Sequence, residues 1–78
     1  MEPKLDANQI ERFKAYLKAT DSDTYDYRGL RDAIRYVLGK GIPYSDSRKI
    51  IEWLDVNRCI EIDRQRRNFS DRLWRIVE

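Results

Sequence analysis

The chain contains no histidine and a single cysteine, Cys59. A zinc site needs about four Cys, His or carboxylate ligands, and a catalytic triad needs an imidazole or an equivalent base. The aspartates and glutamates are scattered and form no recognisable acid–base pair. We therefore expect no catalytic residue, no metal and no cofactor, and the sequence does not predict an enzyme.

Long apolar segments are also absent. No run approaches the roughly 20 residues that span a bilayer, and no stretch resembles the apolar core of a secretory signal peptide. A lone cysteine is typical of a reducing compartment. The sequence therefore predicts a cytoplasmic protein without a membrane segment.

What remains is enough for one small domain. The chain has 78 residues, of which 41% are hydrophobic and 38% are charged, and this balance favours a folded domain over a disordered tail. We expect residues 1–6 to form a flexible lead-in and residues 7–78 to form a single domain. A core of this size supplies about 3–5 kcal/mol of net stability, so an oligomer or a partner would add to it.

Three segments have the apolar spacing of amphipathic helices. They cover residues 7–19, 27–38 and 44–58. Gly39 suits the end of the second helix, and Pro43 cannot continue it. The third helix is expected to be capped at its N-terminus by Ser45 or Asp46.

The last third of the chain changes to the two-residue period of strands. Apolar and polar residues alternate over residues 59–64, and residues 72–77 predict a second strand. The polar segment 65–71 is too long for a two-residue turn, so the predicted hairpin has an open tip. One short extended piece is also expected around Thr24–Tyr25, and Cys59 is expected to be a buried apolar residue at the junction of helix and strand.

Positive charge is concentrated near the C-terminus. The net charge of the chain is only +2, and residues 1–39 carry seven basic and seven acidic side chains, which cancel. From Arg64 to Arg75 there are five arginines and one acid, Asp71, which gives a local charge of +4. Arginines in such a cluster can neutralise nucleic-acid phosphates and release their counterions.

The order of these elements is helix, extended piece, helix, helix, strand, basic loop, strand. It resembles the winged helix-turn-helix family over nearly the whole chain, from Ala7 to Val77. The stretch IPYSDSRKIIEWLDVNRCIEI is similar to the family's third helix and first wing strand. The resemblance implies an α+β fold with three helices and a C-terminal two-stranded β-hairpin wing. Asn57 stands where the family often has glycine, and asparagine tolerates the left-handed backbone conformation.

In members of this family that bind DNA, the third helix enters the major groove and the wing lies along the backbone or minor groove. The resemblance therefore implies a small transcriptional regulator that binds double-stranded DNA. The implied contacts lie at the start of the second helix, on the third helix and in the wing: Tyr27, Arg28, Ser45, Ser47, Arg48, Lys49, Glu52, Arg64, Arg66, Arg67, Asn68 and Arg72.

Other interpretations of the same residues stay open. The arginine-rich tip could be a solvated loop or could bind an acidic protein, and Arg48 and Lys49 could simply pair with Glu52 and Asp55 at helical spacing. The third helix is nearly neutral, which favours a winged-helix protein–protein interaction module as the alternative function. Structured RNA is a third candidate ligand.

Two further expectations concern partners. Phe69 lies in the polar tip, where an exposed ring would mark a contact with a partner. A homodimer would allow two domains to bind two half-sites, and the first helix, with Tyr16 and Leu17, is its candidate surface.

Overall fold

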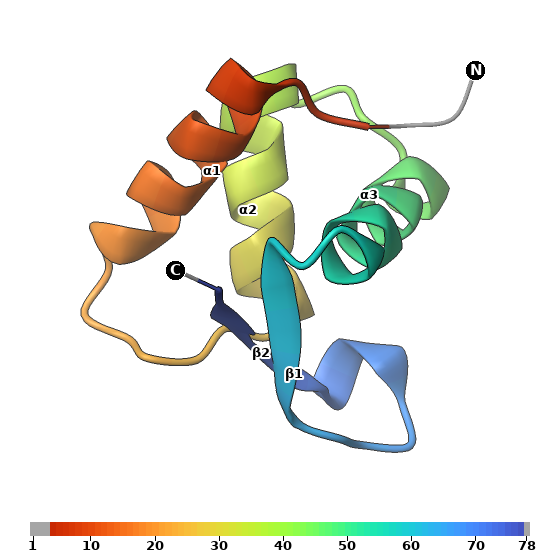
Figure 1. Cartoon of the computed structure of the whole chain (residues 1–78). Coiled ribbons are helices and arrows are strands. Elements are labelled where there is room, and N and C mark those ends of the chain that lie inside the picture. Colours follow the sequence, from red (N-terminus) through yellow and green to blue (C-terminus); the bar gives the residue numbers. More distant parts are fainter. Residues whose placement is uncertain (1–3, 78) are drawn as a thin grey trace.

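The computed structural model describes residues 4–77, which form three α-helices followed by a two-stranded antiparallel sheet (Figure 1). The predicted α+β class is confirmed. α1 and α3 lie on opposite sides of α2 in Figure 1, and the hairpin crosses the lower end of α2 and extends below the helices. The elements are α1 (Ala7–Lys18), α2 (Tyr27–Leu38), α3 (Tyr44–Val56), β1 (Ile60–Arg64), the 3-10 helix η1 (Phe69–Asp71) and β2 (Leu73–Ile76).

The predicted bounds agree closely with the observed ones, with the largest difference at the end of the third helix. α2 covers the predicted residues, α1 ends one residue early, and α3 ends at Val56 rather than at residue 58. β1 and β2 lie within the predicted segments 59–64 and 72–77. Part of the expected open tip is helical, because η1 forms there.

α3 ends in a Schellman motif, which explains its early end. The Cys59 N–H donates to the Leu54 carbonyl at 2.8 Å, and the Arg58 N–H donates to the Asp55 carbonyl at 3.0 Å. This pair of bonds requires a left-handed residue just after the helix cap. That residue is Arg58, with φ 60°, whereas Asn57 has φ −89°. The left-handed residue is thus one position after Asn57, where the family often has glycine, and Cys59 is buried as predicted.

Arg58→Gly is expected to stabilise the protein. A left-handed backbone costs an L-residue about 1–2 kcal/mol, while glycine loses about 0.5–1 kcal/mol more chain entropy on folding. The net gain should be about 0.5–1 kcal/mol, which raises the melting temperature by a few degrees. Thermal melts of Arg58→Gly and Arg58→Ala separate the backbone effect from the loss of the arginine side chain. Equal or lower stability of the glycine variant would contradict this assignment.

The N-termini of the first two helices are capped by aspartates. The Asp6 carboxylate accepts a hydrogen bond from the Gln9 N–H at 2.8 Å, and the Gln9 side chain accepts one from the Asp6 N–H at 2.9 Å, which completes a capping box. Asp26 accepts from the Gly29 N–H at 3.0 Å. Leu5 is buried. The sequence predicts a flexible lead-in over residues 1–6, but Leu5 and Asp6 are part of the fold. Residues 1–3 lie outside the described residues.

A β-bridge joins the hairpin to the segment between α1 and α2. The Tyr25 N–H donates to the Trp74 carbonyl and the Trp74 N–H donates to the Tyr25 carbonyl, both at 2.8 Å. This bridge confirms the extended piece expected at Thr24–Tyr25. Within the hairpin, Ile60 pairs with Ile76 and Ile62 with Trp74, and a bulge follows Ile62.

The core lies where the helices meet the inner face of the hairpin. Trp74 and Phe13 are the largest fully buried side chains. The buried hydrophobic residues come from every helix and both strands: Leu5, Phe13, Leu17, Tyr25, Tyr27, Leu30, Ala33, Ile34, Ile50, Ile51, Leu54, Cys59, Ile60, Phe69 and Trp74. Because Trp74 belongs to both the core and the bridge, it fixes the hairpin against the helices.

Candidate nucleic-acid interface

The outer face of α3 presents most of the residues predicted for it. Ser45, Arg48, Lys49 and Glu52 are all exposed. The Arg48 Nε lies 3.2 Å from the Glu52 carboxylate, one helical turn away. The alternative interpretation, in which Arg48 pairs with Glu52, therefore holds for this residue. An exposed ion pair of this kind contributes little to stability, so it can open for a ligand. Lys49 forms no ion pair within residues 4–77.

Ser47 does not belong to this face. Its side chain is fully buried, so the prediction that it contacts DNA is wrong. The reason is helical periodicity, because Ser47 stands three, four and seven residues before the buried Ile50, Ile51 and Leu54. The apolar spacing of the sequence already contained this signal.

The N-terminus of α3 has no side-chain cap, so the prediction that Ser45 or Asp46 caps it is wrong. The helix begins at Tyr44, and its cap residue is Pro43. Ser45 and Asp46 therefore lie inside the first turn. First-turn N–H groups have no acceptor within a helix, and the helix dipole makes this end positive. The uncapped end can offer these N–H groups to an anion, although the Asp46 carboxylate in the same turn reduces the local positive charge.

Tyr27 is also buried, and the prediction that it contacts a phosphate directly is wrong. Only 7% of its surface is exposed, and its ring packs against Tyr44 at 5.2 Å and Phe69 at 5.8 Å between centroids. Burial raises the pKa of the Tyr27 hydroxyl, and the nearby Arg31 guanidinium opposes that rise in pKa. Tyr27 therefore packs beneath the surface, while its neighbour Arg28 is exposed.

Phe69 links α3 to the hairpin tip. The expectation of an exposed ring is wrong, since only 7% of Phe69 is exposed and its ring lies 6.1 Å from that of Trp74. The Arg48 guanidinium carbon lies 4.6 Å from the ring centroid, and that of Arg72 lies 5.5 Å from it. Cation–π contacts of this kind hold a guanidinium in place without neutralising its charge. A helix cation and a hairpin cation are thus held on one buried ring.

The remaining tip residues extend this basic surface. Arg64, Arg66 and Arg67 are exposed, and their guanidinium groups form no ion pair within the described residues 4–77. The Arg72 Nε donates to the Arg66 carbonyl at 3.2 Å, which orders the tip backbone. The Asn68 amide donates to the Asp71 carboxylate at 3.2 Å, so its side chain is partly engaged.

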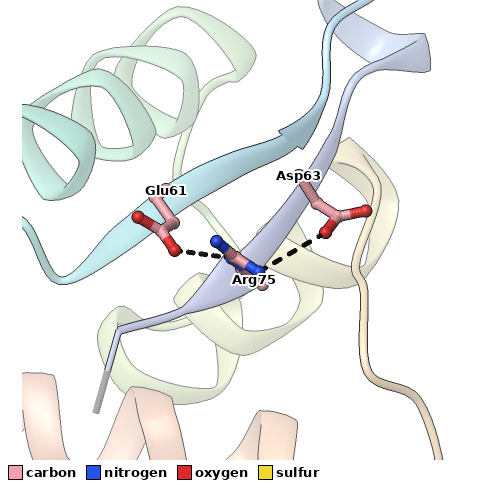
Figure 2. A network of polar contacts seen from close by, with 3 residues as sticks. All are labelled: Glu61, Asp63 and Arg75. Carbon is pink, nitrogen blue, oxygen red and sulfur yellow. Dashed lines mark hydrogen bonds and ion pairs between the residues drawn. The ribbon is translucent and has the colours of Figure 1, made fainter.

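Arg75 contributes no free positive charge to this surface. Figure 2 shows its guanidinium between two carboxylates of β1, with Nε 2.5 Å from Glu61 and Nη1 3.9 Å from Asp63. Glu61 is the register partner of Arg75, and a bulge follows Ile62. The C-terminal charge excess predicted from the sequence is therefore carried by the tip, and the outer face of the strands is locally neutralised.

Two residues missed by the sequence interpretation adjoin the interface. Arg31 lies beside Tyr27, has a buried Nε without a hydrogen-bond acceptor and forms no ion pair within residues 4–77. Tyr44 is half exposed at the start of α3. Arg31 and Tyr44 lie near each other because α2 packs against α3. The residues next to them in the sequence do not predict this proximity.

The dimer surface expected on α1 included Tyr16 and Leu17, and the prediction is wrong for Leu17. Leu17 is buried in the core and cannot contact a partner. Tyr16 is half-buried at the core edge.

No other class of site stands out in the described part of the chain. Residues 4–77 gather no group of three or more His, Cys, Asp or Glu side chains that could hold a metal ion. None of the helices described here has the length and hydropathy needed to cross a membrane. Comparison with protein-family models, curated proteins and solved structures finds no match for the chain.

Proposed function

We propose that the chain is a winged helix-turn-helix domain that binds double-stranded DNA, as a small cytoplasmic transcriptional regulator. One observation carries this proposal. Arg48 of α3 and Arg72 of the hairpin both lie over the Phe69 ring, which places the outer face of α3 next to the arginine-rich tip. The short bridge at Tyr25 adds the extended piece that the family places between its first two helices.

The proposed interface has two parts with different tasks. The outer face of α3 enters the major groove, where Lys49 can donate to guanine and Glu52 can accept from a cytosine amino group. The hairpin tip carries Arg66 and Arg67, which form no ion pair within residues 4–77. It follows the backbone or the minor groove, whose negative potential attracts arginine. Arg28 at the start of α2 adds a phosphate contact. The tip thus supplies affinity, and α3 supplies sequence preference.

The alternative function is a winged-helix module that binds another protein. A specific observation favours it: Val56 is 80% exposed and lies on the line of α3 that also carries Ser45, Lys49 and Glu52. An exposed valine on a nearly neutral helix face suits an apolar protein contact, although a valine can also meet a thymine methyl group. The two functions differ in their dependence on salt.

Titration of the protein into a labelled random-sequence duplex, followed by fluorescence anisotropy, tests the proposal. Between about 50 and 200 mM salt, three to five phosphate contacts predict a log–log slope of roughly −3 to −5. The same titration with a single strand and with a structured RNA shows whether duplex DNA is preferred. Absence of duplex binding at the lowest salt would reject DNA binding and leave the protein-interaction function.

A further inference from the structure

A line of three arginines runs along the outer side of α2. Arg28, Arg31 and Arg35 follow one another at intervals of three and four residues, so they stand within about 60° of one another around the helix. Arg28 is exposed, and Arg31 and Arg35 are half-buried. These three residues are called the α2 arginine stripe below. Only Arg28 belongs to the interface proposed above.

The positive charges of the stripe are not neutralised by the part of the chain that the structure describes. None of the three arginines forms an ion pair within residues 4–77, although Asp32 stands four positions after Arg28 and three before Arg35. The Nε atoms of Arg31 and Arg35 are buried and have no hydrogen-bond acceptor. A guanidinium group can only donate hydrogen bonds. An anionic partner would supply both the acceptors and the opposite charge.

The stripe lies beside the proposed DNA interface. Arg31 is close to Tyr27, whose ring contacts Tyr44 at the start of α3 and Phe69 in the hairpin tip. The first turn of α3, which has no side-chain cap, therefore lies next to the stripe. A partner that covers α3 and the tip can thus reach the stripe as well.

We propose that the α2 arginine stripe binds the phosphate backbone of the duplex beside the groove that α3 enters. This binding rests on the proposed function, and it adds Arg31 and Arg35 to the residues that hold the duplex. Each guanidinium can form two parallel hydrogen bonds to the oxygens of one phosphate. α2 rises about 1.5 Å per residue, so the stripe covers about 10 Å, over which one DNA strand presents about three phosphates.

The composition of the stripe favours a phosphate backbone over an acidic protein. A contact between proteins draws most of its energy from a buried centre of apolar or aromatic side chains. The stripe has no such centre, because its three members are all arginines. A phosphate backbone needs only a row of cations, and the planar guanidinium fits a phosphate better than an ammonium group does.

Replacing Arg31 and Arg35 together by glutamine tests the stripe in the duplex titration. The loss of two charged phosphate contacts should lower the magnitude of the log–log salt slope by about 2. Affinity at about 0.1 M salt should fall about tenfold, which is less than two full contacts, because glutamine still donates hydrogen bonds to phosphate. Arg31→Lys combined with Arg35→Lys keeps both charges and should keep the slope. Thermal melts establish that each variant is folded.

Lys14→Gln combined with Lys18→Gln is the matched control. Both lysines belong to α1, which lies on the opposite side of α2 from α3 (Figure 1), and their replacement removes the same net charge. This pair should leave the salt slope unchanged. A slope that falls equally in both glutamine pairs, or that stays unchanged without Arg31 and Arg35, would overturn the proposal.

The outcomes also separate the stripe from the proposed function. If the natural chain binds the duplex with a slope that does not depend on Arg31 and Arg35, the stripe alone is rejected and an acidic protein becomes its candidate partner. If the natural chain binds no duplex at the lowest salt, DNA binding and the stripe are rejected together.

Discussion

Replacing both Arg66 and Arg67 by alanine is expected to weaken binding to duplex DNA about 50-fold at about 0.1 M salt. Each lost phosphate contact removes about 0.9 of a released counterion, which corresponds to roughly a seven- to eightfold change in affinity at this salt concentration, so two contacts together give about 50-fold. The two guanidinium groups are suited to this role because they are exposed and form no ion pair within residues 4–77. The log–log salt slope should fall in magnitude by about 2.

The control for this experiment removes the same net charge elsewhere. Lys18 and Arg75 line one cavity beside the loop between α1 and α2, away from the hairpin tip. Lys18→Ala combined with Arg75→Ala should change DNA affinity by only a fewfold, because Arg75 already interacts with Glu61 and Asp63. If both double variants weaken binding equally, affinity follows net charge alone and the tip has no special role.

Phe69→Ala is expected to destabilise the protein by about 3 kcal/mol, since large-to-small changes of a buried phenylalanine cost about 3–5 kcal/mol. The domain has only about 3–5 kcal/mol of net stability, so this change should leave much of the protein unfolded at 37 °C. The ring contacts Tyr27 and Trp74 and holds Arg48 and Arg72, so its loss affects both the core and the basic surface. Urea denaturation and heteronuclear NMR spectra measure the effect.

Phe69→Leu separates the two roles of the ring. Leucine keeps most of the apolar burial and should cost about 1.5 kcal/mol or less, so the variant stays folded. It lacks a π-face, and Arg48 and Arg72 lose their cation–π contacts. We expect the folded leucine variant to bind DNA severalfold more weakly than the natural chain. Unchanged stability in Phe69→Ala would show that the ring is not part of the core.

Features that depend on near neighbours in the chain could be predicted from the sequence. The bounds of α2 follow from the spacing of its apolar residues, and the strands follow from the change to a two-residue period. Even the burial of Ser47, which the prediction missed, is encoded in its spacing from Ile50 and Leu54. The position of the left-handed residue after α3 does not follow from intrinsic preference, because asparagine tolerates this conformation better than arginine does, while the helix hydrogen bonds place Arg58 there.

The sequence by itself determined the order of the elements, the apolar faces of the helices and the concentration of arginine near the C-terminus. Only the tertiary structure decided that Phe69 is buried, that Arg75 is paired and that Arg48 and Arg72 flank the same ring. The physical reason is the range of the interactions. Helix and strand periods arise from residues a few positions apart, whereas the surroundings of Phe69 come from α2, α3 and β2, which only folding brings together.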